Sequence, residues 1–387
     1  MDLQLAGRGR PILVALAVAS ALALFAIAVS MAGVRTAEAA YVSSTFAPVE
    51  VVEQGPGSGV AVVPDGGVDL WTGPERDPFM TLHEGVVLPF LHRSGDWLLV
   101  TTMCNDTAWV NAEDVTVVPQ AESYGEPGTG FDLSTATIVI DPGHGARDWG
   151  GVGPSGLSEK EVNLDISVRV RELMAASHDI DWSDGSVSTG SAVPAFGNVI
   201  LTRNPDGPND GDYELGLGYR SAVATGAGAD AFVSIHNNTV PRVDTDIPGS
   251  EVYYSVGVAE SERLAGIIYE ELLFSFAAFD ADWSGGELQG ARARVDPDTG
   301  DDYYGLLRRA TMPAVIVEGV YISEPDEEAL LATPEFRQAY AEAVYRGVVR
   351  FLTTDENGIA ANRPEIFFAD AGIVAGSGCE LPAQPGH

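Results

Sequence analysis

The sequence predicts an α/β fold, a largely parallel twisted sheet with helices on both faces, preceded by a small all-β barrel. Two observations lead to this prediction. From residue 134 onward, short β-branched runs alternate with longer helical patterns, as in parallel sheets. Between residues 59 and 119, short apolar runs are instead separated only by turn residues, which is typical of small barrels.

The first 40 residues differ in composition from the rest of the chain. Arg8 and Arg10 precede an apolar segment at residues 11–34, and Ala-Glu-Ala at residues 37–39 is a small-residue cleavage site. This order is typical of an export signal. The segment is also long enough to span a bilayer, so an uncleaved membrane anchor is the alternative. Both interpretations place the remaining chain outside the cytoplasm, secreted, in the wall or anchored, because positive charge precedes the apolar run.

The first folded domain is expected at residues 59–119, after a linker rich in Ser, Pro and Gly at residues 41–58. Turn residues separate its apolar runs. The predicted strands are residues 59–63, 68–71, 86–91, 97–100 and 107–110. A polar Gly/Pro stretch at residues 120–133 predicts a second linker, so we expect this domain to be separable from the rest of the chain.

The second domain is predicted over residues 134–352. Its strands are expected at residues 137–140, 198–202, 231–235, 252–255 and 314–317. Its helices are expected at residues 159–176, 213–227, 261–277, 303–310 and 334–351. Ser158 and Glu161 predict a capping box at the first helix. Polar stretches at residues 177–197 and 279–302 predict loops, and the aperiodic tail at 353–387 predicts partial disorder.

The charge balance excludes one class of partner. The chain has 56 acidic residues against 21 Lys and Arg, a formal net charge of −35, and Lys160 is its only lysine. No basic face can form, so nucleic-acid binding is not expected. Acidic runs at residues 204–212 and 296–302 resemble calcium loops but lack the full twelve-residue pattern.

Three predicted strands of the second domain end in residues capable of metal or proton chemistry. His144 follows the turn after the first strand, His236 directly follows the third, and Glu318 directly follows the fifth. Because parallel strands end at one edge of the sheet, we expect these side chains to converge with Glu159. Two His and one carboxylate form a catalytic zinc set with an open position for water.

The residue pattern leaves several roles open. Glu159 is either a metal ligand or a charge that complements the helix dipole, a role that Glu161 serves equally. Asp141 and Asp148 are either partners that orient His144 or acids of a strand end and a turn. The two cysteines, Cys104 and Cys379, lie far apart in sequence, and in an exported chain either a disulfide or two free thiols is compatible with that spacing.

Four short motifs lie in the first domain: LWTGP at 70–74, HEG at 83–85, SGDWLLV at 94–100 and AWV at 108–110. With these motifs the segment resembles the bacterial SH3-like domains attached to cell-wall enzymes. The resemblance implies binding to the wall or its peptides. Trp71, Trp97 and Trp109 are either binding residues or the core of the barrel.

Five motifs follow in order in the second domain: VIDPGHG at 139–145, EK with NL within 159–164, LTR at 201–203, FVSIH with Asn238, and MPAVIVEG at 312–319. This domain strongly resembles the zinc-dependent N-acetylmuramoyl-L-alanine amidases. The resemblance implies a zinc ion bound by His144, Glu159 and His236, and a catalytic Glu318. The implied substrate is peptidoglycan, cut at the amide between N-acetylmuramic acid and L-alanine.

Substrate contacts are less well defined. Asn238 and Arg308 are candidates for substrate binding, although Arg308 and Arg220 are also explained as partners of the many acids of the chain. The sequence departs from the family pattern at residues 146–147, at Asn237 and at residues 320–324, which leaves the substrate loops open.

Two other functions are compatible with these motifs. A zinc peptidase that cuts the stem peptide would use the same metal set. An inactive wall-binding protein would keep the fold, but the intact His144, Glu159, His236 and Glu318 argue against it. The sequence identifies no activating partner protein.

Overall fold

The computed structural model describes residues 58–121, 126–203, 215–239, 243–286 and 289–368. The chain divides by its contacts into residues 1–50 and residues 51–387. The expected export signal or anchor, with its apolar segment at residues 11–34, lies outside the described residues. Within the described ranges, no helix combines the length and apolar character needed to cross a membrane.

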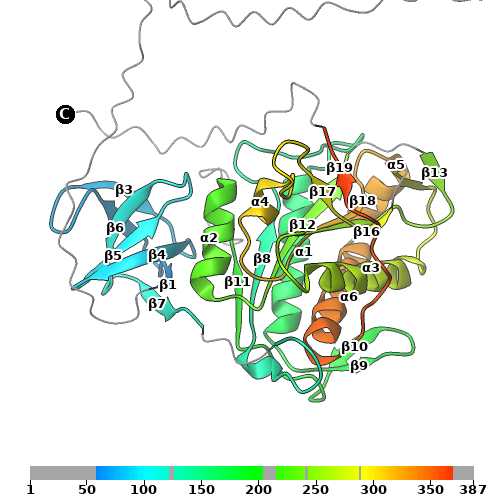
Figure 1. The fold of residues 1–387 in the computed structure, drawn as a ribbon, viewed down its shortest axis with the longest axis horizontal. Coiled ribbons are helices and arrows are strands. Elements are labelled where there is room, and N and C mark those ends of the chain that lie inside the picture. Colours follow the sequence, from blue (N-terminus) through cyan, green and yellow to red (C-terminus); the bar gives the residue numbers. More distant parts are fainter. Residues whose placement is uncertain (1–57, 122–125, 204–214, 240–242, 287–288, 369–387) are drawn as a thin grey trace, which may run out of the picture. The chain divides into compact units, whose positions relative to one another are not determined.

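Residues 59–119 form an antiparallel sheet, which agrees with an all-β first domain (Figure 1). Its seven strands run in the order β3-β2-β6-β5-β4-β1-β7. They are β1 (Gly59–Val62), β2 (Val68–Trp71), β3 (Pro78–Leu82), β4 (Val87–Ser94), β5 (Trp97–Thr101), β6 (Thr107–Asn111) and β7 (Thr116–Pro119). The sequence did not predict β3 and β7. These are the two edge strands of the sheet, and each pairs with a neighbouring strand on one side only.

A six-stranded sheet forms the centre of the second domain, in the order β11-β8-β12-β18-β14-β16. The bounds are β8 (Thr137–Pro142), β11 (Asn198–Leu201), β12 (Ala231–Asn238), β14 (Glu251–Tyr254), β16 (Gly290–Arg292) and β18 (Ala314–Tyr321). Strands β11, β8, β12 and β18 are parallel, as expected, but β14 runs antiparallel to β18. No helix occurs in the described part of the connection from β12 to β14, so the chain returns from the edge at which β12 ends.

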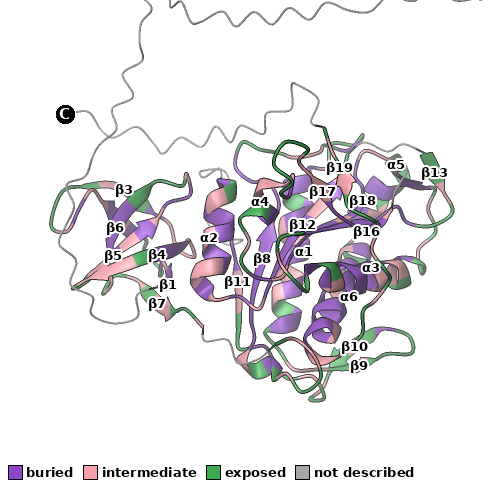
Figure 2. Ribbon diagram, viewed as in Figure 1, coloured by how far each residue is buried: buried purple, intermediate pink, exposed green. Residues whose placement is uncertain are grey.

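Helices cover both faces of this sheet, which confirms that prediction. Helices α1 (Glu159–Met174), α3 (Ser261–Phe276) and α6 (Pro334–Thr353) pack on one face, and α2 (Leu217–Ala227) and α4 (Gly305–Arg308) pack on the other. Successive residues of β8 point to opposite faces of the sheet. Ile138 and Ile140 pack in the core with α1, α3 and α6, whereas Val139 packs in the core with α2 and α4. Figure 2 shows the buried stretches of α6 and of the sheet facing each other.

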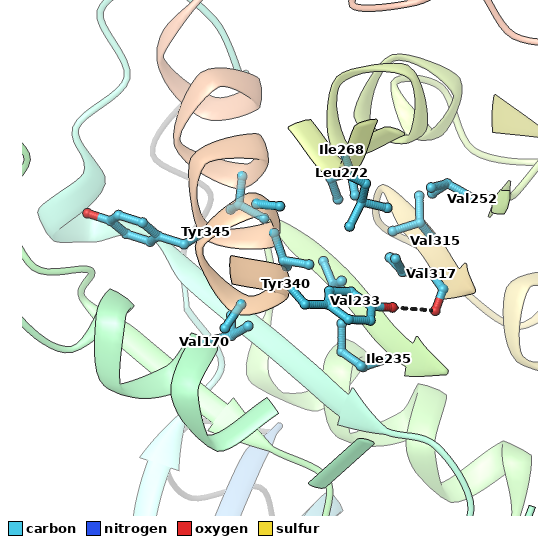
Figure 3. Packing of buried hydrophobic residues seen from close by; sticks show 14 of the residues in the cluster. Val170, Val233, Ile235, Val252, Ile268, Leu272, Val315, Val317, Tyr340 and Tyr345 are labelled. Atoms are coloured by element: carbon cyan, nitrogen blue, oxygen red, sulfur yellow. Dashed lines mark hydrogen bonds between the residues drawn. The ribbon is translucent and has the colours of Figure 1, made fainter. Parts of the chain in front are cut away.

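The core between α6 and the sheet also contains polar anchors. Figure 3 shows Tyr340 of α6 among Val233, Ile235 and Val317, with its hydroxyl directed at a strand carbonyl. Tyr345 points away from this group on the same helix. The ring of Tyr340 fills the space beside Gly319, where an added Cβ would lie 2.3 Å from it. The β18 strand can therefore approach α6 only with glycine at this position.

The first domain packs directly on α2. Its apolar residues form one core cluster with Tyr219, Val223 and Ala227 of that helix. The hydroxyl of Tyr219 donates to the carbonyl of Val87, and a Cβ on Gly226 would lie 2.7 Å from the carbonyl oxygen of Gly59. A common core argues against the expectation that residues 59–119 are separable from the rest.

Several local predictions differ from the structure. Ser158 is the N-cap residue of α1, but its side chain makes no capping bond, so the predicted capping box is absent. The polar stretch at 177–197 contains a hairpin of β9 (His178–Asp181) and β10 (Ser186–Thr189), and the one at 279–302 contains β15 (Trp283–Gly285), β16 and β17 (Arg294–Val295). Helix α5 (Pro325–Leu331) was not predicted.

The start of the tail is ordered. In it β19 (Glu365–Ile366) pairs with β17, and residues 369–387 lie outside the described residues. Cys104 is disulfide-bonded, and Cys379, the other cysteine, lies outside the described ranges.

Of the two acidic runs, only the one at 296–302 lies within the described residues. In the run at 296–302, Asp296 accepts backbone N–H groups from Asp298 and Thr299, so it stabilises a turn. The run at 204–212 lies outside the described residues. Strand β13 (Val243–Thr245) completes the described elements together with a short 3-10 helix at Leu133–Thr135.

Candidate metal centre and active site

The turn after β8 positions His144. Buried Arg220 of α2 donates to the carboxylate of Asp141 over 2.6 Å, to the carbonyl of Pro142 over 2.9 Å and to the carbonyl of His144 over 2.7 Å. His144 has φ of 63°, a left-handed conformation that is uncommon for a residue other than glycine. The three bonds from Arg220 offset the cost of this conformation, so α2 fixes the direction in which the His144 imidazole leaves the turn.

Glu159, the first residue of α1, lies between the two imidazoles. Its Oε2 lies 3.1 Å from Nε2 of His144, and its Oε1 lies 3.1 Å from Nδ1 of His236. His236 comes from β12, so three separate elements supply the group. One donor atom from each residue lies within 4.8 Å of the others. The prediction that these side chains converge is therefore met by the geometry.

The spacing of these atoms suits a small divalent cation. Two ligand atoms that each lie about 2.1 Å from a tetrahedral zinc ion are about 3.4 Å apart. Each of the two imidazoles lies 3.1 Å from a different oxygen of the Glu159 carboxylate. Nε2 of His144 faces Glu159, while its Nδ1 is held by Asp148. Two nitrogens and one carboxylate oxygen are typical donors for a catalytic zinc site, so the residues fit the group.

Backbone and amide donors hold the Glu159 carboxylate in place. Its Oε2 accepts from the N–H of Gly151 over 2.7 Å, and its Oε1 accepts from the N–H of Asn237 over 3.0 Å and from Nδ2 of Asn163 over 3.2 Å. Gly150 packs against the same carboxylate, since a Cβ there would lie 2.5 Å from Oε2. Glu159 is therefore fixed by several hydrogen bonds and is not only a charge at the helix terminus. Glu161, the alternative for that role, is exposed.

The electrostatics of the trio favour positive charge. Burial lowers the pKa of the His144 imidazole, but hydrogen bonds to Asp148 and Glu159 outweigh it and raise the pKa to about 10. Burial raises the pKa of Glu159, yet the hydrogen bonds to His144 and His236 reverse this and hold the pKa well below its ordinary value. The carboxylates on both sides of the His144 imidazole would favour a bound cation in place of its proton.

The two aspartates have different parts in the site. Asp148 lies 2.8 Å from Nδ1 of His144 through its Oδ2, which directs Nε2 toward Glu159. Asp141 does not touch the His144 ring; it accepts from Arg220, Ser234 and Thr202 and so holds the end of β8. Burial raises the pKa of Asp141, but Arg220 and the hydroxyl groups outweigh it and hold the pKa below its usual range.

Glu318 lies beside the trio on the neighbouring strand. It is the register partner of His236 in the parallel pair of β12 and β18, and of Glu251 in the antiparallel pair with β14. Its Oε2 is buried without a hydrogen-bond partner among the described residues. Burial, with further contributions from Glu159 and Glu251, raises the pKa of Glu318 well above its ordinary value. The carboxyl can therefore hold a proton next to the metal-binding group.

A cavity of about 880 Å³ opens over these residues. His144, Glu159, His236 and Glu318 all line it, and so do Asp141, Asp148 and Asn238. Arg308 is not among its lining residues; its guanidinium donates to the carbonyls of Asp302 and Tyr303. The assignments of Asn238 and Arg308 to substrate binding remain predictions.

The residues that support the group of His144, Glu159 and His236 through hydrogen bonds were not predicted from the sequence. Tyr340 donates to the carbonyls of His236 and Val317, and Asn237 and Asn163 hold Glu159. Asn163 lies in a recognised motif, which is a signal for it. Tyr340 lies in the middle of a helical pattern and gives no such signal.

Three convergent donors beside a buried carboxyl, at the carboxyl edge of an α/β sheet, are typical of metal-dependent hydrolases. A model of the N-acetylmuramoyl-L-alanine amidase family matches residues 138–185 and 194–350, more than half of the chain. The chain therefore belongs to this family, the peptidoglycan-hydrolysing amidases.

Several individual amidases are similar to this chain. The germination-specific N-acetylmuramoyl-L-alanine amidase of Bacillus subtilis is 27% identical over 229 residues, which cover 57% of this chain and 81% of that protein. The amidase AmiC of Neisseria meningitidis is 28% identical over 275 residues, covering 59% of this chain and 56% of that protein. Among solved structures, the amidase AmiC2 of Nostoc punctiforme is 29% identical, with a TM-score of 0.41, covering 58% of this chain and 99% of that one.

Proposed function

We propose that the protein is an exported, zinc-dependent amidase that cuts peptidoglycan between N-acetylmuramic acid and the L-alanine of the stem peptide. The observation that carries the proposal is the approach of His144, Glu159 and His236 to within 4.8 Å, with Glu318 in the same cavity. Family membership supplies the substrate class. The export segment at residues 11–34 accounts for access to the wall, whether it is cleaved or retained as a membrane anchor.

The protein side of the reaction follows from the positions of its residues. A zinc ion bound to His144, Glu159 and His236 would polarise the scissile carbonyl and make a bound water acidic. Asp148 keeps the His144 imidazole in the tautomer that presents Nε2. Glu318 accepts a proton from the attacking water and returns it to the leaving amine of L-alanine. Glu318 lines the same cavity as His144, Glu159 and His236, which supports this role.

The first domain is proposed to hold the enzyme on the wall as an SH3-like module. Trp109 is buried, whereas Trp71 and Trp97 are half-buried and lie edge to face with ring centroids 5.5 Å apart. These exposures support a model in which Trp109 stabilises the fold, while Trp71 and Trp97 can contact a peptide.

The activity is tested by mass spectrometry of the fragments that purified residues 41–387 release from isolated peptidoglycan. The proposal predicts stem peptides with a free L-alanine amine and glycan strands with a free lactyl carboxyl group. Cleavage within the stem peptide would identify a peptidase instead. Absence of any cleavage by zinc-loaded protein would favour an inactive wall-binding protein.

A further inference from the structure

The short turn beside the metal centre is clamped by the only lysine of the chain. Gly145 and Asp148 exchange backbone hydrogen bonds of 3.0 and 2.9 Å, so Ala146 and Arg147 form the tip of a two-residue turn. Buried Lys160, which follows Glu159, donates from Nζ to the carbonyl of Ala146 over 2.8 Å.

The same lysine also holds the other side of the tip. Its backbone N–H donates to the carbonyl of Trp149 over 3.2 Å, and its Nζ lies 4.2 Å from the centre of the Trp149 ring. The segment on each side of Arg147 is thus fixed to the first turn of α1. A side chain on a tip held in this way is presented at a defined position relative to the metal ligands.

Arg147 is exposed and lines the cavity, and the described residues offer it no hydrogen-bond or ion-pair partner. The other arginine of the cavity wall, Arg220, is buried and engaged with Asp141 and three backbone carbonyls. An uncommitted guanidinium is unexpected in a chain with 56 acidic residues and only 21 Lys and Arg. Its planar fork of donors matches a carboxylate in shape and charge.

We propose that Arg147 is a specificity-determining residue that binds a free carboxylate on the peptide part of the substrate. Lys160 is a positioning residue that holds the turn. This inference rests on the proposed amidase function and narrows its substrate class to stem peptides that carry a carboxylate near the scissile amide. A carboxamide in the same place keeps the shape but loses the charge, so it should be bound more weakly.

The test uses two muramoyl peptides that differ only in a free α-carboxylate or a carboxamide on the second residue of the stem. We expect wild-type enzyme to have the lower KM for the carboxylate substrate. Arg147→Gln should raise that KM by about 10- to 100-fold, with little change for the carboxamide. Arg147→Lys should restore part of the preference. Arg171→Gln, which removes the same charge from the far end of α1, is the matched control and should behave as wild type.

Lys160→Gln tests the positioning role. It should raise the KM for the carboxylate substrate in the same direction while the zinc content stays unchanged. An equal change in KM for both substrates would show that Lys160 is merely structural.

Calorimetric binding of the free stem peptides, with the carboxylate or carboxamide, gives a readout that needs no turnover. Weaker binding of the carboxylate peptide to Arg147→Gln, with unchanged binding of the other, supports the inference. If neither KM nor binding distinguishes the two peptides in the wild type, the inference is wrong while the amidase function stands. If the wild type cleaves neither substrate, the amidase function fails, and the calorimetric result still decides the role of Arg147.

Discussion

The hydroxyl of Tyr340 lies 3.0 Å from the carbonyl oxygen of His236 and 3.2 Å from that of Val317. One side chain of α6 thereby joins the two strands that carry His236 and Glu318. Tyr345, on the same helix, has a buried hydroxyl without a partner among the described residues. The pair allows the contribution of these hydrogen bonds to be measured against a matched control.

Tyr340→Phe should lower the free energy of unfolding by about 1–2 kcal/mol, because two buried carbonyls lose their shared donor. Tyr345→Phe should be neutral or stabilising, because it removes a buried hydroxyl that makes no bond. Urea unfolding of both variants gives the comparison. Equal losses would show that the Tyr340 bonds contribute nothing specific.

Asp148→Ala should weaken zinc binding by roughly 10- to 100-fold, because the His144 ring loses the partner that orients it. Competition with a chelator of known affinity measures this. Glu161→Gln, on the exposed side of the same helix start, is the control and should bind zinc as tightly as wild type. An unchanged affinity in Asp148→Ala would remove the orienting role.

Glu327 predicts a pH dependence of stability. Its carboxylate accepts the N–H groups of Ser284 and Tyr321, and burial raises its pKa to about 7, above the ordinary 4.5. The native state therefore binds this proton more tightly than the unfolded chain does. Its stabilising effect is complete below pH 4.5 and is lost as the pH rises to about 7.

Between pH 5 and 8, wild type should lose up to about 3 kcal/mol of unfolding free energy relative to Glu327→Gln. The exposed Glu113→Gln variant is the control and should follow wild type across this range. Parallel curves for wild type and Glu327→Gln would show that Glu327 does not titrate there.

The core shared by the first domain and α2 predicts cooperative unfolding. Tyr219, Val223 and Ala227 would face water if the first domain opened separately, so residues 41–387 should show one calorimetric transition. Removal of residues 41–125 should lower the melting temperature of the remainder. Two separated transitions, together with an unchanged melting temperature of the truncated protein, would restore the separable-domain interpretation.

Particular residues show what the sequence could predict. The β-branched runs at 137–140, 231–235 and 314–317 predicted strands correctly, because buried parallel strands need continuous apolar character. The same runs predicted the meeting of His144, His236 and Glu318 at one edge. The reversed direction of β14 was not predictable from its own residues, since direction is set by the connection before it.

Other features depend on partners distant in sequence. The composition of the stretch at 120–133 predicted a free linker between two separate domains. It does not show that the domains contact each other, as Tyr219 and Val87 do. Ser158 and Glu161 have the spacing of a capping box, yet Glu159 and Lys160 between them are held by the turn after β8, and the capping bond is not made. The backbone contacts of Glu159 and Lys160 therefore outweighed the local capping pattern.

The central claim is that Glu159 holds the metal and Glu318 moves the proton. Zinc content and turnover of Glu318→Gln and Glu159→Gln, measured side by side, test it most directly. We predict one zinc per chain in Glu318→Gln with turnover reduced by about 10²–10⁴-fold, and loss of zinc in Glu159→Gln. Loss of zinc in Glu318→Gln with zinc and activity retained in Glu159→Gln would reverse the assignment, and near wild-type turnover of zinc-loaded Glu318→Gln would contradict it outright.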